Sequence, residues 1–113
     1  MHELSIAEDL SIIVLDTALH NNLKKITRVN IILGQMTQIS PDSFEFAFRE
    51  TVRNSIAGGA ELNIEILPMK MKCMNCGSDF QPKENRFTCS LCNSNDIQMI
   101  QGKELFVKSI EGE

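Results

Sequence analysis

Four cysteines, arranged in two pairs, are the residues best suited to chemistry in this 113-residue chain. Cys73-x2-Cys76 and Cys89-x2-Cys92 are separated by twelve residues, so each pair can present two sulfurs to one tetrahedral ion. Neither pair lies within a histidine or carboxylate ligand pattern, and four thiolates leave no open coordination position. The spacing therefore predicts a structural zinc site rather than a catalytic one.

The residues after each cysteine pair fit this interpretation. Gly77 follows the first pair and Asn93 follows the second, and both residue types tolerate the positive φ of a tight turn. Three other interpretations remain open at this stage. The cysteines could be free and buried, they could hold iron as in a rubredoxin-like electron carrier, or nearby methionines could bind a cuprous ion with them. Those methionines are Met69, Met71 and Met74.

The remaining sequence predicts the elements that must carry this loop. A capping box of Ser5 and Glu8 begins a helix over residues 5–20, with Ile6, Leu10, Ile13, Val14 and Ala18 at helical spacing. Alternating apolar residues predict strands over 27–33 and 62–67, and a third short strand covers 105–110. Ser40 and Pro41 begin a second helix, with Phe44, Phe48 and Val52 on one face, and Gly58-Gly59 end it.

A strand, a helix and a strand of this length form a crossover unit, so the first two strands are expected to be parallel neighbours. The predicted fold class is α/β, with a small mixed sheet of about three strands packed with two helices. An inserted zinc-ribbon subdomain at residues 70–102 divides an α/β domain formed by residues 1–69 and 103–113. The cysteine segment has too few apolar residues for a core, so metal must supply its folding energy.

Composition excludes several functions. The net charge is −4, and only 11 lysines and arginines are spread along the chain, so no nucleic-acid partner is expected. No apolar run approaches the roughly 18 residues that cross a bilayer, and the N-terminus does not resemble an export signal. We therefore expect a cytoplasmic protein with no membrane partner. Its serines, histidines and aspartates follow no catalytic pattern, so the protein is not expected to be an enzyme.

Taken without other knowledge, His2 is a solvated terminal residue. Several stretches together, however, resemble the HypA/HybF family of nickel-insertion accessory proteins for nickel–iron hydrogenase maturation, and the resemblance runs from end to end. The matching stretches are Met1-His2-Glu3-Leu4-Ser5-Ile6, Gly34-Gln35-Met36, Ser40-Pro41-Asp42-Ser43-Phe44-Glu45-Phe46-Ala47-Phe48, Ala60-Glu61-Leu62-Asn63-Ile64-Glu65, the two cysteine pairs, Gly102-Lys103-Glu104-Leu105 and Ile110-Glu111.

The resemblance implies that His2 and Glu3 belong to a nickel site and that the cysteine loop binds zinc. It also implies two partners, a nickel-handling GTPase called HypB and the hydrogenase large subunit. Some members of the family also serve urease maturation. Certain relatives carry extra histidines around the zinc loop that are linked to nickel or pH sensing. This loop has none, so any coupling between the metals must run through the cysteines or through packing.

The chemistry of the N-terminus suits nickel. Nδ1 and the backbone nitrogen of His2 close a six-membered chelate ring, and the backbone nitrogens of His2 and Glu3 close a five-membered one. Such a nitrogen field favours square-planar Ni(II) or Cu(II) over zinc. If Nδ1 and the Glu3 nitrogen take the two positions beside the His2 nitrogen, the Met1 amine is excluded and the fourth position is open. His20 ends the first helix far from this site and is expected to interact with the dipole at the helix C-terminus or to be a surface group.

The sequence thus predicts a non-enzymatic nickel metallochaperone that binds Ni(II) at its N-terminus, carries a structural Zn(II), and delivers nickel during hydrogenase maturation. The main alternative is a zinc-ribbon protein-interaction module with an inert N-terminus.

Overall fold

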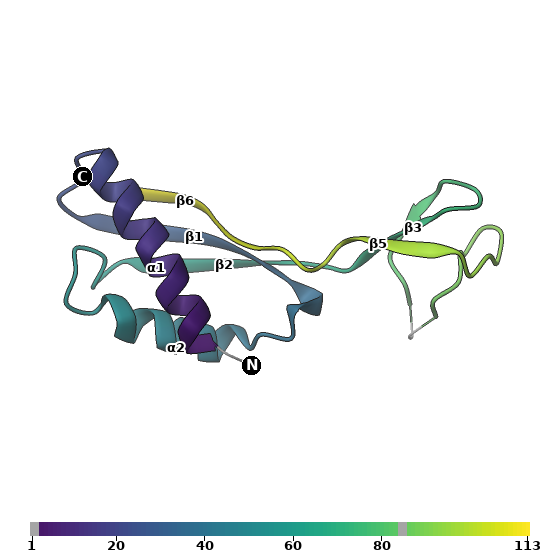
Figure 1. Cartoon of the computed structure of the whole chain (residues 1–113), viewed down its shortest axis with the longest axis horizontal. Helices are drawn as coiled ribbons and strands as arrows, with labels where there is room; N and C mark the ends of the chain where they lie inside the picture. Colours follow the sequence, from purple (N-terminus) through teal and green to yellow (C-terminus); the bar gives the residue numbers. More distant parts are fainter. Residues whose placement is uncertain (1–2, 84–85) are drawn as a thin grey trace.

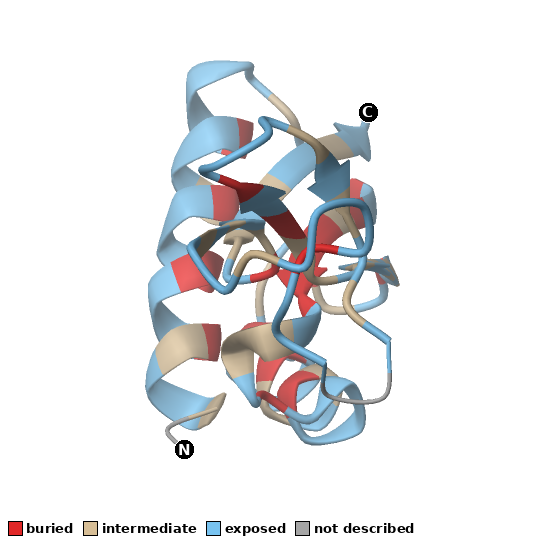
Figure 2. Ribbon diagram, turned by 90° about the vertical axis from the view of Figure 1, so that its right-hand side faces the viewer, coloured by how far each residue is buried: buried red, intermediate tan, exposed pale blue. Residues whose placement is uncertain are grey.

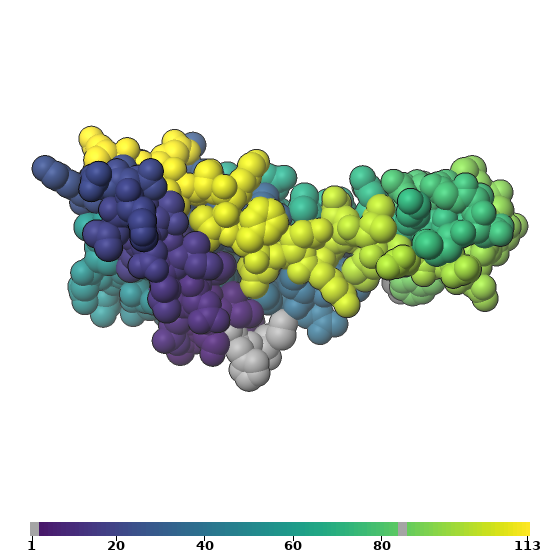
Figure 3. All heavy atoms as spheres, turned by 45° about the horizontal axis from the view of Figure 1, so that its top comes forward, coloured from purple at the N-terminus to yellow at the C-terminus, as the bar shows by residue number. Residues whose placement is uncertain are grey.

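The computed structural model describes residues 3–83 and 86–113 and has two three-stranded sheets (Figure 1). Two helices pack on one face of the first sheet, and the second sheet lies at the opposite end of an elongated molecule of 54 × 26 × 17 Å (Figure 3). In chain order the elements are α1 (Glu3–His20), β1 (Ile26–Gly34), η1 (Gln35–Thr37), α2 (Pro41–Val52), β2 (Glu61–Leu67), β3 (Lys70–Cys73), β4 (Asp79–Phe80), β5 (Ile97–Gln101) and β6 (Leu105–Gly112).

The first sheet has the strand order β2-β1-β6. β1 runs parallel to β2, with Ile31 opposite Ile64, and antiparallel to β6, with Val29 opposite Ile110. The crossover from β1 through α2 to β2 is therefore confirmed, as is a small mixed sheet with two helices. The buried core lies between this sheet and the helices.

Helix α2 begins where Ser40 and Pro41 predict. The Ser40 hydroxyl accepts from the Ser43 N–H at 3.3 Å, and Pro41 occupies the first turn, where no intrahelical donor is needed. The helix ends at Val52, so the predicted end at Gly58-Gly59 was wrong. Ser55 explains the early end, because both its N–H and its hydroxyl donate to the Val52 carbonyl and close a turn there.

Helix α1 begins at Glu3, two residues before the predicted Ser5. An acidic residue in the first turn suits the positive end of the helix dipole, which explains the longer helix. Ile13, one of the apolar residues at helical spacing, is 50% exposed and lies outside the core. The buried side, which faces the sheet in Figure 2, consists of Ala7, Leu10, Ser11, Val14 and Ala18.

The second sheet has the order β4-β3-β5, and the sequence did not predict its strands. Met71 lies at its centre, opposite Phe80 on one side and Met99 on the other. The two sheets share no strand. The division into 1–69 with 103–113 and an inserted subdomain of 70–102 stays a prediction. Within the described residues, no helix is both long and apolar enough to cross a membrane.

Candidate metal centre

The first cysteine pair begins at the last residue of β3, Cys73, and continues into a tight loop that holds Cys76. The Cys73 N–H donates to the Ser78 carbonyl at 2.8 Å, and the Gly77 N–H donates to the Cys73 carbonyl at 2.9 Å. Gly77 has a φ of 80°, as the need for a knuckle turn predicts. These bonds turn the sulfurs of Cys73 and Cys76 toward the same point.

The second pair repeats this backbone arrangement. The Cys89 N–H donates to the Ser94 carbonyl at 2.8 Å, and the Asn93 N–H donates to the Cys89 carbonyl at 2.9 Å. Asn93 has a φ of 61°, which confirms its predicted equivalence to Gly77. Two matching knuckles therefore face each other across the site.

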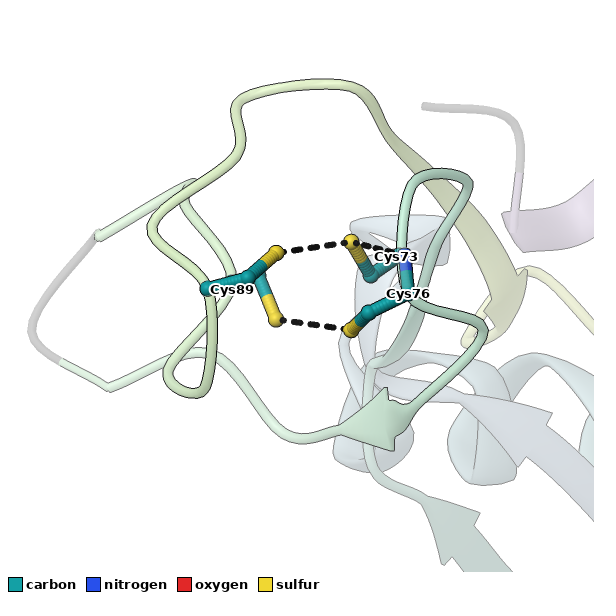
Figure 4. A group of neighbouring side chains, drawn as sticks. Cys73, Cys76 and Cys89 are labelled. Carbon is teal, nitrogen blue, oxygen red and sulfur yellow. Dashed lines mark hydrogen bonds between the residues drawn. The ribbon is translucent and has the colours of Figure 1, made fainter.

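All four cysteine sulfurs lie within 4.8 Å of one another. The Sγ atoms of Cys73 and Cys92 are 3.6 Å apart, as are those of Cys76 and Cys89 (Figure 4). A disulfide requires about 2.05 Å, whereas sulfurs about 2.3 Å from a tetrahedral zinc lie about 3.8 Å apart. The spacing thus fits a metal site formed by four thiolates, with no disulfide among them.

Hydrogen bonds favour the thiolate form at part of this site. The Ser78 hydroxyl, followed by the N–H groups of Cys92 and Leu91, lowers the pKa of the Cys89 thiol to about 6. The Ser78 hydroxyl also lowers the pKa of Cys76. The Cys76 N–H lowers the pKa of Cys73, but burial and the adjacent thiols outweigh it and raise that pKa overall. Metal binding requires deprotonation, so the lowered values favour loading near neutral pH.

Sequence reasoning missed the side chains that surround the sulfurs. The Ser78 hydroxyl lies 3.2 Å from Cys76 Sγ and 3.5 Å from Cys89 Sγ, and the Asn75 amide lies 3.6 Å from Cys92 Sγ. A polar residue inside or just after a Cys-x2-Cys loop is the sequence signal that could have identified them.

The proposed nickel residues lie at the other end of the chain. His2 is outside the described residues, so nothing here places it beside Glu3, which begins α1. His20 is the last residue of α1, about 25 Å from Glu3 at 1.5 Å per residue, and its Nδ1 lies 2.8 Å from the Asp16 carbonyl oxygen. This agrees with the expected position of His20 at the helix end.

The fold and the cysteine cluster define a small metal-binding protein in which an α/β body carries a four-cysteine ribbon. The family described as "Hydrogenase/urease nickel incorporation, metallochaperone, hypA" matches residues 1–112. The chain belongs to this HypA family. The family description is that of a metallochaperone, a carrier rather than a catalyst.

Individual relatives are similar in sequence to this chain over almost their whole length. The hydrogenase maturation factor HypA of Aquifex aeolicus is 37% identical over 111 residues, which cover 98% of this chain and 96% of the relative. The same factor of Wolinella succinogenes is 36% identical over 114 residues, which cover 100% and 96%.

Solved structures are similar in fold as well. The solution structure of the nickel metallochaperone HypA from Helicobacter pylori matches with a TM-score of 0.71 and 27% identity, over 99% of this chain and 97% of that one. A second solution structure of a HypA protein has a TM-score of 0.79 and 27% identity, over 100% and 97%.

Proposed function

We propose that this protein binds Ni(II) as cargo through His2 and Glu3 and delivers it during maturation of nickel–iron hydrogenase, and of urease where the cell has one. The observation that carries the proposal is that Glu3 lies in the first turn of α1. N–H groups in the first turn of a helix have no intrahelical acceptor, so the Glu3 nitrogen can exchange its proton for a metal without breaking a helical hydrogen bond.

The ligand set follows from chelate geometry. The neutral His2 imidazole anchors the ion, and the backbone nitrogens of His2 and Glu3 complete three positions of a square plane. The fourth position lies opposite the His2 nitrogen and stays open to water, the Glu3 carboxylate or a ligand from a partner. Copper binds nitrogen donors more tightly than nickel, so selectivity must come from metal supply and partners.

The second metal has a structural role in this proposal. Cys73, Cys76, Cys89 and Cys92 hold one Zn(II) per chain, which stabilises the ribbon and offers no open position to a substrate. We place the protein in the cytoplasm, where such thiols remain reduced.

The proposed partners are the GTPase HypB, which handles nickel, and the hydrogenase large subunit, which receives it. Glu3, Glu8 and Asp9 give the start of α1 a negative charge, and the latter two are exposed. We expect HypB to contact residues 1–10 with an affinity that falls as salt rises. Cross-linking that maps the HypB contact only to the cysteine loop would contradict this docking site.

The decisive test is nickel binding by isothermal titration calorimetry with untagged protein. His2→Ala removes the anchoring imidazole, so high-affinity nickel binding should be lost while zinc content and far-ultraviolet circular dichroism stay unchanged. His20→Ala is the matched control and should bind nickel normally. Unchanged nickel affinity in His2→Ala would refute the site and favour the alternative, a zinc-ribbon interaction module with an inert N-terminus.

An N-terminal extension tests the ligand set separately. If the Met1 amine is excluded, a short extension before Met1 should preserve a nickel absorption spectrum with amide character. Complete loss of that spectrum would show that the amine is a ligand and would change the proposed coordination. It would not bear on whether His2 is a ligand, which the His2→Ala variant tests.

A further inference from the structure

The two knuckles share a backbone but differ in the side chains that they offer to the sulfurs. Sixteen residues separate equivalent positions. The position of Asn75 in the first knuckle is occupied in the second by Leu91, which is 77% exposed. The position of Ser78 is occupied by Ser94, whose hydroxyl accepts the Asp96 N–H at 3.1 Å and, among the described residues, forms no hydrogen bond with a sulfur.

The donors to the sulfurs are of two kinds, backbone N–H groups and polar side chains. The two buried sulfurs receive backbone N–H groups: Cys76 donates to Cys73 Sγ and Leu91 donates to Cys89 Sγ, each at 3.4 Å. A backbone donor is present whatever the side chain, so these two bonds follow from the fold alone.

Each of the two exposed sulfurs also has a side-chain donor. Ser78 lies 3.2 Å from Cys76 Sγ, and Asn75 lies 3.6 Å from Cys92 Sγ. A metal-bound thiolate has no proton, so the serine hydroxyl must donate to it. Unlike a backbone N–H, either side-chain donor can be removed by a single substitution.

We propose that Asn75 and Ser78 are positioning residues that hold the charge of the Cys92 and Cys76 thiolates, and so set metal retention and thiolate reactivity at the exposed side of the ribbon. Both side chains come from the first knuckle, and each also approaches the second: Asn75 at Cys92, and Ser78 at Cys89, 3.5 Å away. This inference rests on the proposed four-thiolate metal site.

The physical effect follows from the charge of the site. Four thiolates around one divalent ion carry a net charge of −2, and hydrogen bonds withdraw electron density from the sulfurs. Partners of this kind around metal ligands typically change metal affinity by about tenfold or more when removed. Without its donor, an exposed thiolate is more nucleophilic, and the net charge of −2 at the site is less well stabilised.

The experiment uses the full chain loaded with zinc or, for spectroscopy, with Co(II). We compare Ser78→Ala and Asn75→Leu with Ser94→Ala, a matched control that removes a hydroxyl from the equivalent position of the other knuckle. Both test variants should lose zinc to a chelator about tenfold faster, and iodoacetamide should modify Cys76 faster in the first and Cys92 faster in the second. Their sulfur-to-cobalt charge-transfer band should move to lower energy.

The control and a conservative variant separate this role from a folding defect. Ser94→Ala should match the unmodified chain in all three measurements. Ser78→Thr keeps the hydroxyl, so its charge-transfer band and its rate of zinc loss should return to those of the unmodified chain. Equal behaviour of Ser78→Ala, Asn75→Leu and Ser94→Ala would overturn the inference. An unmodified chain that binds neither zinc nor cobalt at the cysteines would overturn the metal site itself, which is a different result.

Discussion

Gly34 and Gly102 approach so closely that a Cβ atom added to Gly34 would lie 2.2 Å from the Gly102 carbonyl oxygen. That carbonyl accepts the Met36 N–H at 2.7 Å, and the Gly34 N–H donates to the Glu104 carbonyl at 2.7 Å. The end of β1 and the chain returning from the ribbon are thus held backbone to backbone. Gly34 has a φ of −71°, so space rather than backbone conformation requires glycine.

Gly34→Ala should therefore destabilise the α/β body. The new Cβ would contact backbone atoms that cannot rotate away, and overpacking of this kind costs about 1–3 kcal/mol of unfolding free energy. Gly59→Ala is the matched control, because its Cβ would meet nothing within 4 Å. Urea unfolding followed by circular dichroism measures both, and equal stability of the two variants would contradict the close approach.

Phe44 should contribute far more stability than Phe46 on the same helix. Phe44 is 0% exposed and stacks on Phe48 with ring centroids 6.0 Å apart, whereas Phe46 is 71% exposed. Phe44→Ala should lower the unfolding free energy by about 3–5 kcal/mol. Phe46→Ala should change it by less than about 0.5 kcal/mol. Thermal unfolding distinguishes them, and a comparable loss in both would mean that Phe46 is covered in solution.

Loss of a cysteine should unfold the ribbon alone. Cys73→Ser or Cys92→Ser removes one of four ligands, and metal binding supplies much of the folding free energy of such segments. We expect less than one zinc per chain and collapsed amide dispersion for residues 70–100 in nuclear magnetic resonance spectra. Signals from β1, β2 and β6 should persist. Collapse of the entire spectrum would contradict the proposed division into body and insertion.

Nickel binding should weaken on acidification. Only neutral imidazole ligates, and a histidine has an ordinary pKa of about 6.5, so protonation competes with nickel below that pH. Nickel affinity therefore falls by at least about tenfold per pH unit below this value, and the two amide protons that nickel must displace add to the dependence on pH. Titrations between pH 5.5 and 7.5 test this, with His20→Ala expected to give the same profile. A profile flat across this range would exclude an imidazole ligand.

Much of the body could be predicted because local signals and packing agree there. Alternating apolar residues such as Val29 and Ile31 predicted β1, because this pattern is typical of a strand with one buried face. Ser40-Pro41 predicted the start of α2, because these residue types favour the first positions of a helix. The cysteine spacing predicted converging sulfurs in the same way.

Other features depend on contacts that the local sequence does not record. The strands of the second sheet are two to five residues long and form because β3 lies between two partners. The end of α2 is determined by Ser55, and the exposure of Ile13 by the direction in which α1 meets the sheet. The hydroxyl of Ser78 reaches two sulfurs only after both knuckles have folded.

The pairing of β1 with β6 also has a consequence for how the chain folds. The Thr27 hydroxyl donates a hydrogen bond to the Glu111 carbonyl across 84 positions of sequence. The sheet is therefore complete only when nearly the last residues of the chain pair with the central strand. Closing so long a loop costs conformational entropy. β3 and β5 pair Lys70 with Gln101, which brings the two ends of the insertion together. A ribbon that has already taken up its metal shortens the loop and should accelerate this final step of folding.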